Sequence, residues 1–157
     1  MPDRYFNNLT KAGAPTSGVD EVKTLTISAT GGTFTLTYSG QTTGTIAYNA
    51  TAAQVQAALE ALSTVGSGNV TVAGNAGGPY TITFTGTLSG LPQTLTSTAS
   101  GLTGGGGTAT VTQATLGVRG DYRGSAAGQI LLDTTNRIIY ENTGTRAKPT
   151  WTEIGVS

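Results

Sequence analysis

Apolar and polar residues alternate along three successive segments in the first third of the chain. This period of two is typical of strands that bury one face and expose the other. Short turns containing glycine separate the segments at residues 30–32 and 39–41. The pattern therefore predicts a three-stranded antiparallel meander. Its inward-facing positions are Leu25, Ile27, Ala29, Phe34, Leu36, Tyr38, Ile46 and Tyr48.

The period changes at residue 51. Thr51 and Gln54 have the spacing of a capping box, in which a hydroxyl and an amide satisfy the free N–H groups of a first helical turn. The apolar residues that follow recur at helical spacing, and glycines at 66 and 68 end the pattern. We therefore expect one amphipathic helix with its apolar stripe on the sheet. That stripe consists of Ala52, Val55, Leu59 and Leu62.

Alternation resumes after the helix. It is clear at residues 70–72 and 80–84, and weaker at 94–98 and 108–115. We predict that residues 21–116 form one mainly β (α+β) domain, an antiparallel, Thr-rich sheet system with a single helix across an apolar face.

The two ends of the chain have other patterns. Residues 1–20 contain prolines and glycines without periodicity, which predicts an N-terminal arm or linker. Residues 117–157 predict a small C-terminal β-hairpin subdomain, whose turn is Asp133–Asn136. A third short strand is expected at 150–154. Strands this short bury too little area to fold alone, so the subdomain must pack on the main domain, on copies of itself or on a partner.

Charge and residue inventory narrow the possible functions. Glu60 is the only charged residue between Thr24 and Val118, and the chain has no histidine and no cysteine. The missing residues remove His- and Cys-based catalysis and the usual zinc sites. The carboxylates that remain for paired catalysis are Asp121, Asp133, Glu141 and Glu153. Asp133 is better explained as a turn residue and the other three as solvated charges, so we predict no enzymatic activity, no cofactor and no metal.

Three further motifs have simpler interpretations than binding sites. The turn 133–136 offers calcium only one carboxylate. Gly104–Gly107 lacks the Lys-Ser/Thr of a phosphate-binding loop and predicts a flexible loop. Arg119-Gly120-Asp121 spells a cell-adhesion tripeptide but suits a charged hinge. The outward threonines predict a solvated sheet face, with glycan binding as the alternative.

The formal net charge is zero and the pI is near 6.1, so no overall field recruits nucleic acid or an anionic membrane. The first residues lack the pattern of a signal peptide, and no apolar run is long enough to span a bilayer. We expect synthesis in the cytoplasm and no nucleic-acid or membrane partner.

Residues 21–107 resemble a module found in virion proteins of phages that infect actinobacteria. The likeness rests on the order strand, turn, strand, turn, helix with the same residues recurring. The end of the chain resembles a hairpin motif of phage fibre and head-associated proteins. The segments that carry the two resemblances are 21–27, 32–37, 46–62, 68–72, 79–86 and 101–105 for the first, and 128–140, 142–145 and 149–151 for the second.

This resemblance implies a non-enzymatic structural protein of a virion, made in the host cytoplasm. The leading interpretation is a capsid decoration protein on the outside of the head, bound to the major capsid protein and to sister copies as a homo-oligomer, for which a trimer is one arrangement. Many weakly bound copies on a symmetric shell would stabilise it by mass action. The alternatives are a tail-associated or fibre protein that contacts the host surface, and a carbohydrate-binding module.

Five residues at the two ends are the candidates for partner binding. Arg and aromatic residues dominate the energetics of interfaces, and the ends of the chain place them in segments without a sustained core pattern. They are Arg4, Tyr5 and Phe6 in the arm, with Tyr140 and Trp151 in the tail. The competing interpretations are a frayed terminus for the first three and a small tail core for the other two.

Overall fold

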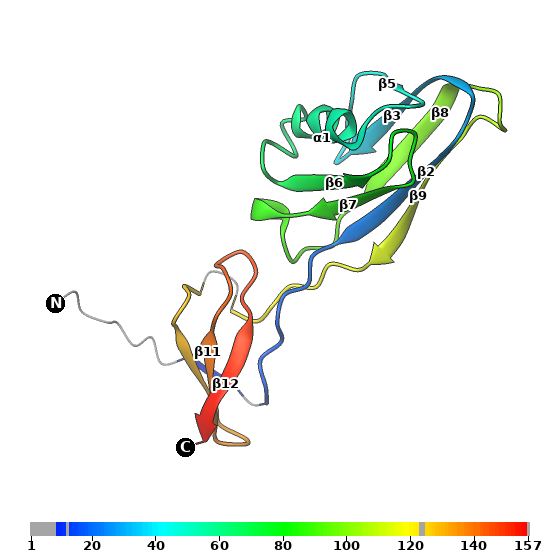
Figure 1. The fold of residues 1–157 in the computed structure, drawn as a ribbon. Helices are drawn as coiled ribbons and strands as arrows, with labels where there is room; N and C mark the ends of the chain where they lie inside the picture. The colour runs from blue at the N-terminus through cyan, green and yellow to red at the C-terminus, as the bar shows by residue number, and fades with distance from the viewer. Residues whose placement is uncertain (1–8, 12, 123–124, 157) are drawn as a thin grey trace. The chain divides into compact units, whose positions relative to one another are not determined.

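The computed structural model describes residues 9–11, 13–122 and 125–156, which form two compact units (Figure 1). The large unit comprises residues 20–117. The small unit combines the described residues before 20 with those after 117. The large unit is therefore inserted, in the order of the chain, between two segments of the small one.

Two antiparallel sheets form the large unit. The first has the order β6 (Val70–Gly74), β7 (Tyr80–Phe84), β2 (Val22–Ser28), β9 (Thr108–Thr115). In the second, β3 (Gly31–Tyr38) pairs with β8 (Leu95–Thr103), and also with the short strands β4 (Gln41–Thr42) and β5 (Ile46–Ala47). A single 3₁₀ turn, η1 (Gly86–Leu88), follows β7. The prediction of a mainly β fold with antiparallel sheets and one helix is confirmed.

The predicted meander is wrong at its first step, because β2 and β3 belong to different sheets. β2 pairs with β7 and β9, whereas β3 pairs with β8. The chain passes from the first sheet to the second at Ala29–Thr30. The turn between β8 and β9 passes between the same two sheets beside it, and Ser28 Oγ donates a hydrogen bond to the Gly105 carbonyl of that turn at 2.5 Å. The crossing lets apolar residues of β2 and β3 face one core from opposite sheets, which hairpin pairing would not do.

Gly32 shows why glycine follows this crossing. Its φ is +83°, and a Cβ there would lie 2.0 Å from the Gly101 carbonyl oxygen on β8. Only glycine satisfies both the left-handed backbone and the close approach of the two strands.

The helix α1 (Ala52–Glu60) begins as predicted. Thr51 accepts the Gln54 N–H at 3.3 Å, and the Gln54 side chain accepts the Thr51 N–H at 2.8 Å, which completes the capping box. Val55 and Leu59 are buried, and α1 lies against β6 and β5. The Gln56 side chain accepts the Val72 N–H at 3.0 Å, so the helix also covers the outer edge of β6, a terminal strand of its sheet.

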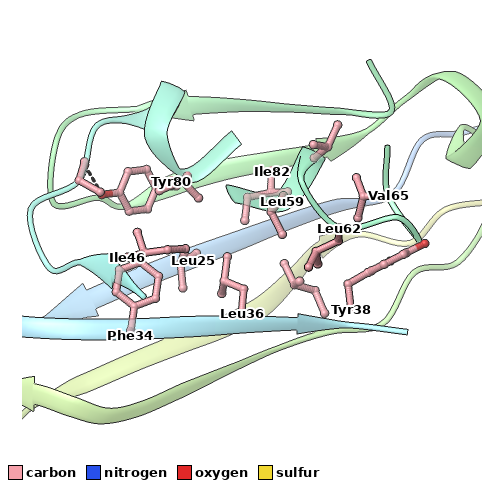
Figure 2. Packing of buried hydrophobic residues seen from close by; sticks show 14 of the residues in the cluster. Leu25, Phe34, Leu36, Tyr38, Ile46, Leu59, Leu62, Val65, Tyr80 and Ile82 are labelled. Carbon is pink, nitrogen blue, oxygen red and sulfur yellow. Dashed lines mark hydrogen bonds between the residues drawn. The ribbon is translucent and has the colours of Figure 1, made fainter. Parts of the chain in front are cut away.

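One hydrophobic core lies between the two sheets and the helix (Figure 2). Tyr80 is completely buried in it, and its hydroxyl donates to the Ala50 carbonyl at 2.5 Å. Burial raises the pKa of Tyr80, although the hydrogen bond from Gly77 opposes the shift. The buried apolar residues are Leu25, Phe34, Leu36, Tyr38, Ile46, Ala50, Val55, Leu59, Leu62, Val65, Val70, Tyr80, Ile82, Phe84, Leu95 and Leu102.

The small unit is a four-stranded sheet. Its order is β1 (Leu9–Lys11), β10 (Ile130–Asp133), β11 (Ile138–Asn142), β12 (Trp151–Val156). The hairpin of β10 and β11 and the third strand β12 agree with the sequence pattern. Residues 9–11, which we expected in an arm without structure, instead pair in parallel with β10. The hairpin offers β1 an open strand edge, and three residues are too few to show a period in sequence.

Within the described residues, no helix has the length and apolar character needed to cross a membrane.

Candidate functional site

The five predicted partner-binding residues have different positions. Arg4, Tyr5 and Phe6 lie outside the described residues. Tyr140 lies on β11 and is half-buried, whereas Trp151 begins β12 and is only 8% exposed. The structure thus places Trp151 in the interior of the small unit, as in the competing interpretation of a tail core, and leaves part of Tyr140 accessible.

Trp151 connects three segments of the small unit. Its indole N–H donates to the Asp121 carbonyl at 3.1 Å, and its backbone N–H donates to Ser17 Oγ at 3.2 Å. The ring of Tyr122 meets it edge-on, with centroids 6.1 Å apart. An aromatic residue with its polar atom satisfied in this way stabilises the unit that it joins.

Residues 16–19 were also expected in the arm, and they too belong to the small unit. The Asp121 carboxylate accepts the Thr16 N–H at 2.5 Å, and the Thr16 carbonyl accepts the Asp121 N–H at 2.8 Å. Val19 and Val118 form an antiparallel bridge with hydrogen bonds of 2.9 and 2.8 Å. Asp121 is therefore not simply a solvated charge, because its carboxylate holds a segment more than 100 residues away in sequence.

Asp133 is the turn residue predicted from sequence. Its Oδ1 accepts the backbone N–H of Thr135 at 2.8 Å and of Asn136 at 3.2 Å, and Oδ2 accepts the Asn136 amide at 2.8 Å. Oδ1 also accepts the Gly13 N–H at 2.8 Å. Burial alone would raise the pKa of Asp133, but these four hydrogen bonds favour the carboxylate and hold the pKa below its ordinary value. Both oxygens are occupied by N–H donors, which leaves little capacity for calcium.

Asn142, at the end of β11, is a buried polar residue that the sequence analysis did not single out. Its amide donates to the carbonyls of Ser125 and Ala126 at 2.9 and 3.3 Å, and its carbonyl accepts the N–H of Gly144 and Thr150 at 2.9 and 3.0 Å. All four bonds of the amide are made within the small unit. A lone asparagine after a strand gives no sequence signal of this role.

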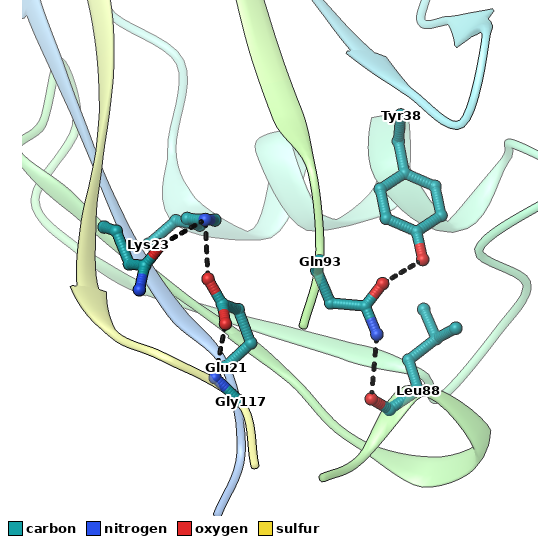
Figure 3. Close-up of polar contacts among 7 residues, drawn as sticks. Glu21, Lys23, Tyr38, Leu88, Gln93 and Gly117 are labelled. Atoms are coloured by element: carbon teal, nitrogen blue, oxygen red, sulfur yellow. Dashed lines mark hydrogen bonds and ion pairs between the residues drawn. The ribbon is translucent and has the colours of Figure 1, made fainter. Parts of the chain in front are cut away.

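A second polar cluster lies in the large unit, where the chain enters and leaves it (Figure 3). Glu21 is completely buried and Lys23 is 8% exposed, and Lys23 Nζ lies 2.5 Å from Glu21 Oε1. Lys23 Nζ also lies 3.4 Å from Gln113 Oε1, and Glu21 Oε2 accepts the Gly117 N–H. The sequence did contain a signal for this pair. Glu21 and Lys23 precede buried Leu25 at intervals of two residues, so the alternation of a strand places all three side chains on the same face.

Three further carboxylates, Glu60, Glu141 and Glu153, do not belong to either polar cluster. Glu141 is half-buried, Glu153 is exposed, and Glu60 accepts the Gly68 N–H at 2.9 Å beside its own helix. Among the described residues, no three His, Cys, Asp or Glu side chains gather in a way that could hold a metal ion.

The threonine-rich strands and the glycine loop have the positions expected of them. Outward positions such as Thr26, Thr110 and Thr112 are exposed. Gly104–Gly107 forms the turn between β8 and β9, closed by a 2.9 Å bond from the Gly107 N–H to the Gly104 carbonyl. Glycan binding by the threonine faces stays the alternative hypothesis to a solvated surface.

Comparison with known proteins finds similarity to a structural protein of a phage. No family model matches it. It is 49% identical over 76 residues to the tail sheath protein of Mycobacterium phage Bxz1, a match that covers 48% of this chain and 12% of that protein. The matched stretch of 76 residues is longer than the two segments of the small unit taken together, so it includes part of the large unit.

The predicted resemblance to virion structural proteins of actinobacteriophages is confirmed by this relative. The chain spans only 12% of the relative's length. A solved structure from Mycobacterium phage Patience is 24% identical, with 87% of this chain and 57% of that chain covered and a TM-score of 0.46.

Proposed function

We propose that this chain is a non-enzymatic structural protein of the virion exterior, in which the small unit attaches to the particle and the large unit is displayed. The observation that carries the proposal is the insertion of the large unit: its first and last strands, β2 and β9, lie side by side in one sheet. An inserted domain with adjacent ends can be carried by different proteins without disturbing the part that carries it.

The surfaces of the two units support this division. The large unit encloses its core between two sheets, and α1 covers the edge of β6. Among its described large apolar side chains, Leu116 alone is exposed, at 52%. The described surface of the large unit is dominated by threonine and glycine and carries few charges. No described aromatic residue of this unit is exposed and the unit has no arginine, so it lacks the side chains in which protein interfaces are enriched.

The small unit has an incompletely covered sheet. Leu131 and Asp133 are completely buried on one face, whereas Ile130, Leu132 and Ile139 share the other face by register and are only half-buried. Ile154, at a bulge of β12, is 51% exposed. A short sheet becomes more stable when a partner covers its half-buried apolar side chains. We therefore propose this face of β10 and β11 as the attachment surface.

Two locations on the particle fit this mechanism. The first is the head, where the protein would decorate the capsid, bind the major capsid protein and contact sister copies. The second is the tail, which the match to a tail sheath protein favours. In either case the expected activity is adhesive, and the residues described here offer no nucleophile–base pair of the His or Cys type.

Co-sedimentation of the tagged chain with purified heads and, separately, with purified tails tests the proposal. Binding to heads supports decoration of the capsid, and binding to tails alone supports the second location. A matched pair of variants locates the surface: Leu132→Asp should weaken binding, whereas Thr110→Asp, on the large unit, should not. Absence of binding to either particle would contradict the proposed function.

A further inference from the structure

The polar cluster at the ends of the large unit brings together an amine, a carboxamide and a buried carboxylate. Lys23 on β2 and Gln113 on β9 are Cα partners across the two strands, and Lys23 Nζ lies 3.4 Å from the Gln113 carbonyl oxygen. Glu21 Oε1 lies 2.5 Å from the same Nζ (Figure 3). These two strands are the first and the last of the large unit.

We propose that Lys23 and Gln113 join in an intramolecular amide bond, with Glu21 carrying the protons. The reaction needs an amine nucleophile held beside a carboxamide carbon and a group that takes a proton from the amine and gives one to the leaving nitrogen. Pairing of β2 with β9 supplies the proximity, and the contact between Glu21 and Lys23 supplies the proton carrier.

The step balances without any further reactant. Glu21 takes one proton from the Lys23 ammonium, and the neutral Nζ attacks Cδ of Gln113. The new Nζ–Cδ bond forms as the bond from Cδ to the amide nitrogen breaks, and Glu21 passes its proton to that nitrogen, which leaves as ammonia. The remaining extra proton on Nζ returns to Glu21, so the products are a secondary amide, ammonia and a neutral Glu21.

The surroundings of Glu21 favour this role over that of a simple ion pair. Its Oε2 is fixed by the Gly117 N–H, and apart from the Lys23 ammonium no described group donates to its Oε1. The carboxylate is completely buried, where an ion pair costs desolvation energy. The reaction removes both buried charges, and therefore has a driving force that a lasting ion pair lacks.

The bond would close a covalent loop from residue 23 to residue 113. The chain has no cysteine, and such a link would stabilise it as a disulfide does, by restricting the unfolded state. It would also join the two strands through which the large unit is connected to the small one. This bond is expected whether the protein attaches to the head or to the tail of the particle.

Intact mass spectrometry of the full chain under denaturing conditions tests the proposal, immediately after purification and after long incubation at neutral pH. We expect a mass lower than that of the sequence by one ammonia, and a digest in which the peptides containing Lys23 and Gln113 are linked. Lys23→Arg and Glu21→Gln should each have the full mass calculated for their own sequence, without the loss of ammonia. Lys148→Arg, a matched control in the small unit, should still lose ammonia.

A wild-type mass equal to that of the sequence at both times would overturn the proposal, and it needs no variant to fold. Loss of ammonia that persists in Lys23→Arg would also overturn it, because the loss would then come from another residue. Neither result would affect the binding measured with heads and tails.

Discussion

Asp133 Oδ1 accepts the backbone N–H of Gly13 at 2.8 Å, across 120 positions of sequence. The same oxygen caps the turn of the β10–β11 hairpin through Thr135 and Asn136. One carboxylate therefore shapes the hairpin and also holds the segment that follows β1. This arrangement explains why residues before the large unit become part of a fold built mainly from residues after it.

The pH dependence of the small unit should follow Asp133. Its pKa is lowered in the folded state, so its contribution to stability is complete above the ordinary pKa of about 3.8 and is lost as the pH falls through the lower folded value. Trp151 is the only tryptophan and lies in this unit, so its fluorescence reports the unit's unfolding. We expect an acid transition in Trp151 emission below about pH 4.

Asp133→Asn should lower the stability of the small unit at neutral pH and flatten this acid transition, since the amide keeps one acceptor but loses the charge. Glu153→Gln, at an exposed position of β12, is the control and should change neither property. An acid transition of equal size in Asp133→Asn would show that other carboxylates cause it.

The apolar stripe of α1 should carry much of the stability of the large unit. Leu59 is completely buried, and Leu59→Ala should cost about 2–5 kcal/mol in the free energy of unfolding. Thr26→Ala, on the exposed face of β2, should change it by less than about 0.5 kcal/mol. Chemical denaturation followed by circular dichroism measures both, and similar costs would mean that the stripe is not buried.

Gly117 should not tolerate a side chain. A Cβ at this position would lie 2.2 Å from the Leu91 carbonyl oxygen and 3.0 Å from Glu21 Cβ. Gly117→Ala should therefore displace the N–H that binds Glu21 and lower the melting temperature of the large unit. Gly44→Ala is the matched control, because a Cβ there meets no atom within 4 Å. Equal melting temperatures for the two variants would contradict the close packing around Glu21.

Local patterns in the sequence predicted the elements of this fold well. The capping box of Thr51 and Gln54, the inward parity of Phe34, Leu36 and Tyr38, and the hairpin turn at Asp133 all depend on neighbouring residues, and all are confirmed. These features arise from side chains within a few positions of one another, which a sequence displays directly.

The pairing of distant segments could not be predicted in the same way. Nothing in residues 24–38 distinguishes a hairpin from a crossing between sheets, because alternation fixes the buried face of each strand and not its neighbour. The parallel pairing of β1 with β10 and the bond from Thr16 to Asp121 depend on segments more than 100 residues apart. The buried Glu21 and Lys23 could have been predicted, since they continue the parity of Leu25.

The segment before β1 should contribute to attachment if Arg4, Tyr5 and Phe6 bind a partner. Removal of residues 1–18, the obvious test from sequence, would also remove β1 and the Ser17 contact with Trp151. Removal of residues 1–8 alone avoids this damage. We expect weaker co-sedimentation with the particle and an unchanged melting temperature, and unchanged binding would assign attachment to β10 and β11.

The most direct test of the account measures particle binding by each unit separately. Val19 and Val118 are already paired in an antiparallel bridge, so a short glycine-containing turn can replace residues 20–117. The sequence predicted that residues 117–157 could not fold alone, but β1 and residues 16–19 add a fourth strand and further hydrogen bonds to this unit. Trp151 fluorescence tests whether the shortened chain folds. We predict that it co-sediments with the same particle, heads or tails, as the full chain, and that isolated residues 20–117 fold but do not bind. Binding by residues 20–117 together with loss of binding by the folded, shortened chain would contradict the account.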